Sequence, residues 1–548
     1  MESKDKAQRQ EITQDSAAPA CARLRALDWR FLLPTPPAGG FRHLLLLGGS
    51  ASLRELIIES GLARQVTLTV PQDQTVDAVV ILRRADVAPA AVAHALAPGA
   101  VLYWELDRRQ PSRLRYTPAR IRRQLHEAGC KPTGFYWIRP NFANPQLYIP
   151  LDTQGLRWYL DTLFVAATPA LRICEPGLRL LARRGSDALA WLAGCSAVTA
   201  VAEPAPDSAP SVLASPALPA PLRCPTLRPL MLTAGGDDFN RVILLPFTPD
   251  STEPVAVFKL SRHPSRNEHT ENEQLMLAAL QKEVADPIQH ALPRPLGSFQ
   301  WGEISVGVES CVPGQLLLAS TGRWGVSQAQ KTKQIQDVVA WLTAFHYQVQ
   351  TSRIRWDEAA LQQWVESRLA AYEQAFALTA GEERLFAEVR RRARLLIDTS
   401  LPMVWEHYAF GDWNIYRDGP KTYVVDWEGA SRGLPLFDLL YLVIHSTYVA
   451  QNLSDEAAQL RCFRELFCTG GQTDPIPQLA QEWITHYMSE LEIDPRFYPM
   501  LLVLMWVIRA LSRFDRQVGL QNEGHRRSNN QYIGYIAILA DHVEQLFS

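Results

Sequence analysis

Two charged residues lie in apolar surroundings in the second half of the chain. Lys259 is the one charged residue in the apolar run Val255–Leu260, which the pattern predicts to be a strand. Glu273 lies in a predicted helix over 267–280, and leucines follow it at i+4 and i+7, so the glutamate shares the face that packs inward. Since an unpaired buried ammonium group is costly, we predict a buried Lys259–Glu273 ion pair that could hold the lysine against phosphate oxygens. The alternative is an edge-strand lysine whose ammonium group reaches solvent.

A second group of polar residues follows in the motif WEHYAFGDWNIY (405–416). His407 lies near its start and Asn414 near its end, and the apolar strand TYVVD then ends in Asp426. An amide oxygen and a strand-end carboxylate, about a dozen residues apart, can converge on one divalent cation. Glu428 lies two residues further on and could reach a second cation.

The elements before Lys259 suggest a hairpin. Leu230–Thr233 and Val242–Phe247 are predicted strands, and the sequence AGGDDFN joins them. Gly235 and Gly236 would let backbone N–H groups approach phosphate oxygens closely. By itself this signal is weak, because any hairpin turn favours such residues.

In this order the residues resemble the aminoglycoside phosphotransferase and choline kinase family, which has a protein-kinase-like fold. The resemblance covers about residues 228–530. It implies ATP and Mg²⁺ as cofactors, with Lys259 as the phosphate-binding lysine and Glu273 as its helix partner. It further implies that His407 opens the catalytic loop and that Asn414 and Asp426 are metal ligands.

A strand over 303–308 leads into Glu309–Gly314, whose Pro-Gly break is typical of a hinge between a small β lobe and a larger helical lobe. Adenine would bond to backbone groups there, around Glu309 and Cys311. A helix predicted over Gln334–Phe345 ends in His346, which we interpret as a packed helix terminus rather than a catalyst.

The sequence departs from the family at position 409. The family's loop reads His-x-Asp-x-x-x-x-Asn, and its aspartate orients the acceptor hydroxyl and takes its proton, whereas this chain has Ala409 in that place. Asp412 is the nearest substitute base, but it lies only two residues before Asn414, so its carboxylate would leave the loop in a different direction. Losing a general base typically costs about 10²–10⁴-fold in rate, whereas nucleotide and metal binding should survive.

Two explanations for Ala409 compete. Decay into a pseudokinase usually erodes several parts of a site, yet the lysine, the glutamate and both proposed metal ligands are present. A single carboxylate replaced by alanine is also typical of a deliberate inactivating substitution, and on that interpretation, which we slightly favour, the parent protein is an active phosphotransferase. Asp438, in PLFDLLYL, is predicted to fix the catalytic loop, the alternative being a plain helix cap.

The first part of the chain alternates predicted strands and helices, which indicates a parallel, doubly wound (Rossmann-type) sheet. Residues 40–150 weakly resemble the class I S-adenosylmethionine-dependent methyltransferases, on the segments LLLLGGSAS, DAVVIL and LAPGAVLYWE. The glycine turn lacks the expected spacing, however, and the second strand ends in Val70-Pro71 without the acid that would hold a ribose. S-adenosylmethionine binding is therefore not expected, and a structural or docking module is the preferred interpretation.

The domain organisation follows from one break in composition, at EPAPDSAPSVLASPALPAPLRCPTLRP. We predict an α/β plus α+β chain with these parts: a disordered tail (1–24), a degenerate methyltransferase-like domain (25–202), a Pro/Ala-rich linker (203–229), a kinase-like small lobe (230–312) and a kinase-like helical lobe (313–548).

Composition excludes several function classes. Lys plus Arg number 55 and Asp plus Glu 57, so a net charge of −2 gives no field for nucleic acid. The eight cysteines contain no CxxC pair and fit a cytoplasmic protein with reduced thiols, and the longest apolar runs stop short of a membrane span. The predicted function is ATP- and Mg²⁺-dependent phosphorylation of a hydroxyl on a small molecule or glycan. The alternatives are a nucleotide-binding pseudokinase scaffold and, more weakly, a methyltransferase.

Overall fold

The structure is a computed structural model, which describes residues 24–34, 36, 39–85, 87–106, 118–142, 144–151, 153–184, 194–203, 222, 228–233, 240–248, 250–350, 352–469, 475–517, 527 and 529–548. Three predicted features lie outside these residues: residues 1–23 of the tail, Gly235 and Gly236, and all of the linker (203–229) except 203, 222, 228 and 229. The chain forms two compact units. The first comprises 1–164, 174–274 and 294–311, and the second comprises 165–173, 275–293 and 312–548.

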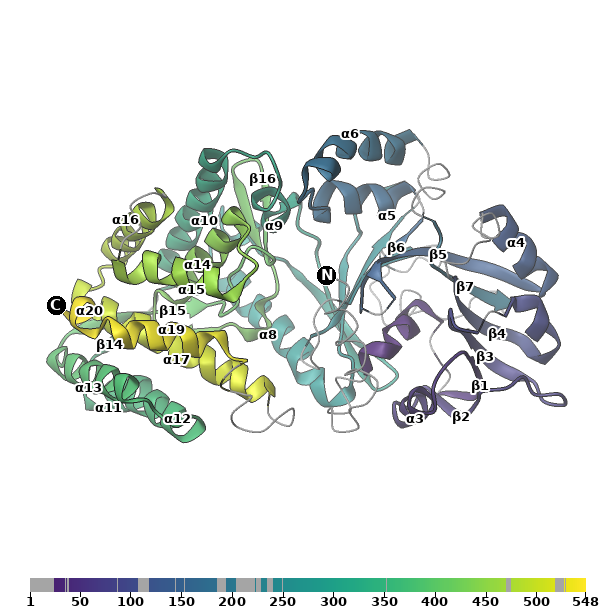
Figure 1. Ribbon diagram of the computed structural model, residues 1–548, viewed down its shortest axis with the longest axis horizontal. Coiled ribbons are helices and arrows are strands. Elements are labelled where there is room, and N and C mark those ends of the chain that lie inside the picture. Colours follow the sequence, from purple (N-terminus) through teal and green to yellow (C-terminus); the bar gives the residue numbers. More distant parts are fainter. Residues whose placement is uncertain are drawn as a thin grey trace. The chain divides into compact units, whose positions relative to one another are not determined.

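The first unit is built on one 12-stranded sheet, in the order β11-β12-β10-β9-β8-β6-β5-β7-β4-β3-β1-β2 (Figure 1). Its strands are β1 (Phe41–Leu47), β2 (Ala63–Thr67), β3 (Val76–Ile81), β4 (Leu96–Glu105), β5 (Cys130–Asn141), β6 (Asn144–Pro150), β7 (Ala197–Ala202), β8 (Arg228–Leu232), β9 (Val242–Phe247), β10 (Val257–Leu260), β11 (Pro295–Trp301) and β12 (Ile304–Glu309). Strand β8 pairs with β6, through Leu147 opposite Leu232. The strands before and after the predicted linker therefore belong to one continuous sheet.

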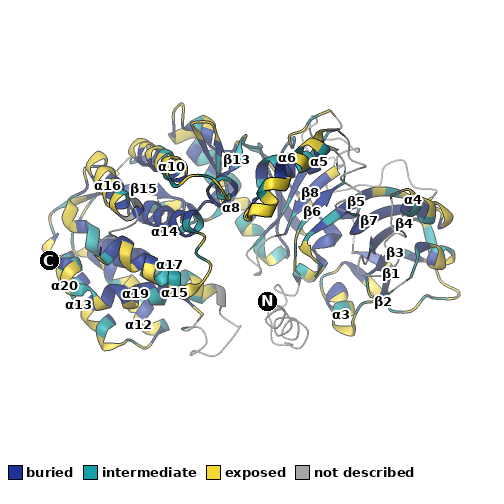
Figure 2. Cartoon of the chain, turned by 45° about the horizontal axis from the view of Figure 1, so that its top comes forward, coloured by how far each residue is buried: buried dark blue, intermediate teal, exposed yellow. Residues whose placement is uncertain are grey.

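Strands β1, β3, β7, β9 and β12 are buried at nearly every position. Helices flank this sheet. They are α3 (Ala51–Glu59), α4 (Pro118–Glu127), α5 (Thr153–Trp158), α6 (Pro169–Arg184) and α8 (Asn267–Glu283), of which α6 and α8 each contain a boundary between the two units. Figure 2 shows the strands mainly in the buried colour, whereas α3 and α4 carry exposed faces. Strand β7 is buried at every position, which explains its unbroken apolar sequence.

The section β2-β1-β3-β4 is parallel, as expected from the alternation of strands and helices, and the remaining pairs in the sheet are antiparallel. Between β3 and β4, where the alternation predicts a helix, the chain forms the 3-10 helix Pro89–Ala95. Gly48 ends β1 with φ of 75°, and a Cβ there would lie 2.7 Å from the backbone nitrogen of Ala85. The turn after β1 thus brings the chain close to the backbone of the loop that follows β3. The resemblance of this region to methyltransferases stays a prediction.

The segment Arg25–Leu32 forms a 3-10 helix that packs into the core of this unit. Leu24, the last residue of the predicted disordered tail, is buried, so the tail prediction is wrong at that residue. The Trp29 ring stacks on Tyr103 of β4 with centroids 5.1 Å apart, and the Phe31 ring lies 5.1 Å from Trp301 of β11. One short segment therefore packs against the edge strand β11 and against β4, which lie far apart in the order of the sheet.

The second unit is mostly helical around one large hydrophobic core. Its helices are α9 (Leu317–Thr321), α10 (Gln328–Val349), α11 (Glu358–Leu361), α12 (Ser367–Ala375), α13 (Ala380–Leu395), α14 (Phe437–Gln451), α15 (Glu456–Arg464), α16 (Pro475–Glu490), α17 (Tyr498–Gln517), α19 (Gln531–Asp541) and α20 (Val543–Phe547). Its short strands are β13 (Gln315–Leu316), β14 (Ser352–Arg355), β15 (Ser400–Glu406), β16 (Ile415–Asp418), β17 (Lys421–Val424) and β18 (Ser431–Gly433).

Helix α17 supplies the most apolar stretch of the second unit. The segment Pro495–Asp515 is long and apolar enough to span a membrane by length and composition, and 56% of its apolar window is buried inside the protein. Every residue of Met500–Val507 belongs to the core. Packing against the other helices accounts for its apolar sequence.

Candidate active site

Lys259 lies near the end of β10, in the middle of a buried charge network. Its Nζ atom lies 2.6 Å from Oε1 of Glu273 on α8 and 2.9 Å from Oε1 of Glu309 at the end of β12. The other oxygen of Glu273 accepts a hydrogen bond of 2.5 Å from Arg241. The predicted Lys259–Glu273 pair is thus present, and the edge-strand alternative is wrong because β10 lies between β9 and β12.

Two members of this network were not predicted from the sequence. Glu309 was expected to act through its backbone at a hinge, but its side chain is buried against Lys259, and burial raises the pKa of its carboxyl to about 7. Arg241 is the first residue of the chain after the predicted glycine turn and lies directly before β9. In both cases the available signal was a charge at the end of an apolar strand. The network places the two carboxyl groups of Glu273 and Glu309 around the cations Lys259 and Arg241, which makes burial of Lys259 tolerable.

Cys311, the other predicted hinge residue, follows β12 and is half-buried. Burial raises the pKa of its thiol to about 12, so the side chain stays neutral at physiological pH. The six cysteines in the described part of the chain are all free.

The predicted catalytic loop, 407–414, joins β15 to β16 in the second unit. Asp438, near the start of α14, holds its entry, because its carboxylate accepts hydrogen bonds from the backbone of His407 (2.5 Å) and Tyr408 (2.9 Å). Asp438 therefore fixes the loop, as predicted, and the residue that caps α14 is Leu436.

His407 uses both nitrogens of its ring within the site. Nε2 lies 2.8 Å from the carbonyl oxygen of Val425, and Nδ1 accepts a hydrogen bond of 3.2 Å from the backbone of Ala409. These contacts assign the proton to Nε2 and leave no ring nitrogen for a substrate. His407 ties the loop to the strand end that carries Asp426, so its part is to position the loop rather than to move a proton.

Ala409 is half-buried, and its backbone is tightly held. Its carbonyl oxygen accepts hydrogen bonds from Nδ2 of Asn414 (3.0 Å) and from the backbone of Gly411 (2.8 Å). Since the amide nitrogen of Asn414 is engaged there, Oδ1 is the Asn414 atom suited to a cation. The backbone of Asn414 also accepts a hydrogen bond of 3.0 Å from Val425, which places the next residue, Asp426, beside it.

Asp426 adopts a left-handed backbone conformation, with φ of 72° and ψ of 56°, directly before the 3-10 turn Trp427–Gly429. A residue other than glycine in this region costs about 1 kcal/mol or more, although Asp and Asn tolerate it best. Asp426 and Glu428 are both half-buried. The strained turn re-aims the chain at Asp426, a feature that recurs at functional sites.

Asp412 is fully buried, and each of its carboxylate oxygens has a hydroxyl partner. Oδ2 accepts from Thr321 of α9 at 2.9 Å, and Oδ1 accepts from Ser446 of α14. Burial raises the pKa of Asp412 to about 6. A carboxylate enclosed in this way cannot take a proton from an acceptor in solvent, so Asp412 joins two helices to the loop and is no substitute for the missing base.

A buried cluster of His346, Glu406 and Asp438 lies under the loop, with ligand atoms within 4.8 Å of one another. The backbone nitrogen of Asp438 donates to Glu406 at 2.7 Å, and burial next to Asp438 raises the pKa of Glu406 well above its usual value. His346 lies inside α10, in its last turn, with Nδ1 2.6 Å from the hydroxyl of Tyr487 and Nε2 3.1 Å from the carbonyl oxygen of Trp405. The cluster is a hydrogen-bonded support, and His346 is packed, as predicted.

We expect His346 to make the second unit sensitive to acid. Burial lowers the pKa of His346 to about 3 from its usual value of 6.5, so the unfolded chain binds a proton that the folded chain refuses. Stability therefore falls as pH falls from about 6.5 towards about 3, by about 1.4 kcal/mol per pH unit from this group. His346→Gln, which keeps a donor and an acceptor, should show a shallower loss of the denaturant midpoint between pH 7 and pH 5. His290→Gln, at an exposed side chain, is the control and should match the parent slope.

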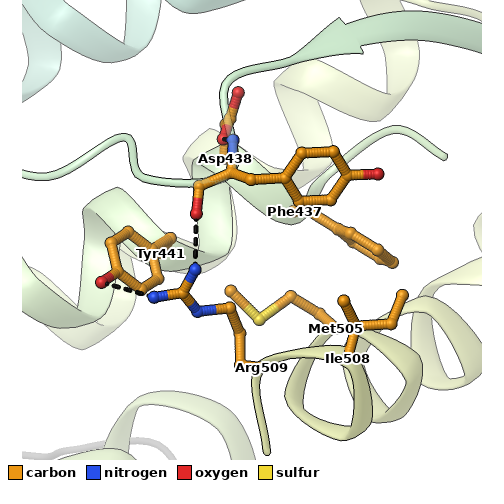
Figure 3. A pocket seen from close by; sticks show the side chains of 7 residues that line it. Phe437, Asp438, Tyr441, Met505, Ile508 and Arg509 are labelled. Atoms are coloured by element: carbon orange, nitrogen blue, oxygen red, sulfur yellow. Dashed lines mark hydrogen bonds between the residues drawn. The ribbon is translucent and has the colours of Figure 1, made fainter. Parts of the chain in front are cut away.

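Arg509 of α17 supports the loop from another side (Figure 3). It donates to the carbonyl oxygen of Tyr408 at 2.6 Å and to the hydroxyl of Tyr441 at 2.9 Å, and its guanidinium lies 4.4 Å from the centroid of the Tyr441 ring. Tyr408 has φ of 59°, so this contact secures a left-handed residue immediately before Ala409. The cavity beside Arg509 is about 10 Å³, which suits one water molecule and no substrate.

Comparison with known proteins places this region in a family context. Residues 248–467 match the model of the phosphotransferase enzyme family, which confirms the resemblance predicted from the sequence for this part of the chain and supports the kinase-like fold there. No curated protein matches the chain.

Solved structures that are similar include a choline/ethanolamine kinase family protein from Mesorhizobium loti (14% identity, 59% of this chain and 92% of that one, TM-score 0.32). A macrolide 2'-phosphotransferase from Brachybacterium faecium is 18% identical over 56% of this chain and 91% of that one, with a TM-score of 0.30.

Proposed function

From the match of residues 248–467 to the phosphotransferase enzyme family, we propose that this protein is an ATP- and Mg²⁺-dependent phosphotransferase that acts on a hydroxyl of a small molecule or glycan. The observation that carries the proposal is the buried lysine of β10, whose ammonium group lies between Glu273 and Glu309. A lysine fixed in this way presents a localised positive charge to phosphate oxygens without a large loss of side-chain entropy.

The proposed metal ligands suit Mg²⁺ by their chemistry. Asn414 offers an amide oxygen and Asp426 a carboxylate, and hard oxygen donors of this kind are what Mg²⁺ prefers alongside substrate phosphates. When bound, Mg²⁺ would neutralise charge on the phosphates. Within the chain, Asn414 and His407 hold Val425 in place, and Asp438 and Arg509 hold the backbone before Ala409.

The neighbourhood of the loop also bears on the acceptor. Trp413, adjacent to Asn414, is 39% exposed, and its ring meets His445 edge-on at 5.2 Å. An exposed aromatic ring next to the loop suits the apolar face of a sugar. This supports a glycan or another ring-bearing alcohol as acceptor within the proposed function.

Removing the lysine tests the proposal. Lys259→Met should weaken MgATP binding about tenfold or more, since a charge-assisted contact to phosphate is lost. Titration with a fluorescent ATP analogue, followed by displacement with ATP, measures the effect.

The matched control is Lys331→Met. Lys331 is also buried, but its Nζ donates to the carbonyl oxygen of Ala450 at 2.8 Å, in the second unit. Lys331→Met should lower the stability of the protein, and its affinity for MgATP should equal that of the parent. Equal nucleotide affinity in Lys259→Met and the parent would refute the proposed phosphate site.

The second candidate function is a nucleotide-binding pseudokinase, and Ala409 is the observation that favours it. The backbone around Ala409 keeps its hydrogen bonds to His407, Asn414 and Gly411 although the carboxylate is absent. A loop kept in shape without its base would still support nucleotide binding.

A further inference from the structure

A fully buried ion pair joins the start of the chain to the strand that carries Lys259. Nε of Arg262 lies 3.0 Å from Oδ1 of Asp28, and Nη2 of Arg262 lies 2.9 Å from Oδ2. Neither side chain has measurable exposure. The two residues are 234 positions apart, and Arg262 follows β10 by two residues.

The same guanidinium holds two backbone carbonyls. Nη1 donates to Asn240 at 2.6 Å and Nη2 donates to Thr233 at 3.1 Å. Thr233 directly follows β8, and Asn240 precedes Arg241. Arg262 therefore fixes the end of β8 and the approach to β9 at one point, with all three of its guanidinium nitrogens engaged.

Fixing Asn240 also fixes the next residue, Arg241, whose guanidinium donates to Glu273 at 2.5 Å. Glu273 in turn holds Nζ of Lys259 at 2.6 Å. A chain of contacts thus runs from Asp28 through Arg262 to the carbonyl oxygen of Asn240, and from the adjoining Arg241 to the glutamate that orients the lysine. Such bonds are short and directional, so a change at one end shifts the other.

We propose that Asp28 and Arg262 are positioning residues for the phosphate-binding lysine, so that the N-terminal segment Arg25–Leu32 is a working part of the nucleotide site. This inference rests on the proposed function, because it concerns the alignment of Lys259 with phosphate. Without Asp28, Arg262 becomes an uncompensated buried cation. It then has no anchor that holds Asn240 and Thr233 in register, and Arg241 and Glu273 lose their alignment.

A merely structural ion pair would affect every ligand alike, whereas a positioning pair affects only ligands that carry phosphate. The test compares MgATP with adenosine, each displaced against a fluorescent ATP analogue, on the full chain. Asp28→Asn should weaken MgATP binding about tenfold, the scale of one charge-assisted contact, and leave adenosine within about twofold. Equal weakening of both ligands, or no weakening of either, would overturn the proposal.

Arg262→Lys covers the case in which Asp28→Asn does not fold. It keeps the charge opposite Asp28 but lacks the planar fork that reaches Asn240 and Thr233 together, so it should show the same selective loss. Glu382→Gln is the matched control: Glu382 is a fully buried carboxylate paired with Arg527 at 2.7 Å in the second unit. It should lose stability without changing the ratio of MgATP to adenosine affinity.

The variant Lys259→Met separates this inference from the proposed function. In that background, Asp28→Asn should weaken MgATP binding no further, because its effect passes through the lysine. If Lys259→Met itself leaves MgATP binding unchanged, the proposed function fails. If Lys259→Met weakens binding but Asp28→Asn does not, the proposed function stands and the role of Asp28 is wrong.

Discussion

Replacing Ala409 by aspartate is expected to raise the rate of phosphoryl transfer by about 10²–10⁴-fold, the usual contribution of a general base. The position is prepared for the change, because the hydrogen bonds of Ala409 to His407, Asn414 and Gly411 all use backbone atoms. The side chain is half-buried at the loop, so a carboxylate there keeps access to an acceptor. The measurement is ATP consumption with a panel of hydroxyl compounds, together with a search for mass gains of one phosphate in a metabolite extract.

The matched control is Ala409→Asn, which has the shape of aspartate without its basicity. It should stay at the parent rate, and both variants should keep the parent's affinity for MgATP, since the base acts on the acceptor and not on the nucleotide. If Ala409→Asp consumes ATP no faster than Ala409→Asn across the panel, the nucleotide-binding pseudokinase is preferred over the phosphotransferase.

The Lys259–Glu273 pair could be predicted from the sequence because the local sequence around each residue indicates its environment. A lone charge in an apolar strand must find a partner, and helical periodicity places Glu273 on the inward face. Asn414 and Asp426 could be proposed as metal ligands from the sequence because the loop length and the strand end fix their spacing. The resemblance to the phosphotransferase family then organised these local signals into one site.

The roles of Arg241 and Glu309 could not be predicted in the same way. Their partners depend on strand order, because β9 and β12 lie on either side of β10 and bring Arg241 and Glu309 towards Lys259 from opposite ends of that short strand. Periodicity tells which face of a strand is buried, but not which strand is its neighbour. The Asp28–Arg262 pair is the extreme case, since no pattern connects residues 234 positions apart.

The continuous sheet was missed for a related reason. A proline-rich stretch predicts a linker, and a linker suggests independent domains. Strand β6, which precedes this stretch in the sequence, nevertheless pairs directly with β8, at the end of it. Both strands have unsatisfied edges unless something covers them, and pairing with each other removes those edges. An α/β sheet and a small-lobe sheet can thus merge without a change in either local sequence pattern.

Replacing Asp426 by asparagine is expected to abolish most of the Mg²⁺-dependent part of ATP binding, at least about tenfold in affinity. Asparagine is the sharper substitution than alanine, because it tolerates the left-handed conformation at φ of 72° and so removes charge without disturbing the turn. Titration of a fluorescent ATP analogue with Mg²⁺ and with EDTA measures the metal-dependent difference for each variant.

The charges of the two proposed ligands indicate which of them should contribute more to Mg²⁺ binding. Asn414 contributes a neutral oxygen and Asp426 a full negative charge, so capture of the cation depends mainly on Asp426, whereas Ala409→Asp should leave the metal-dependent difference nearly unchanged. Glu428→Gln is the neighbouring control, since Glu428 is also half-buried and lies two residues further along the same turn. A loss confined to Asp426→Asn assigns the principal ligand. Nucleotide affinity in Mg²⁺ equal to that of the parent would instead show that the metal assignment is wrong and that the kinase-like loop is a relic.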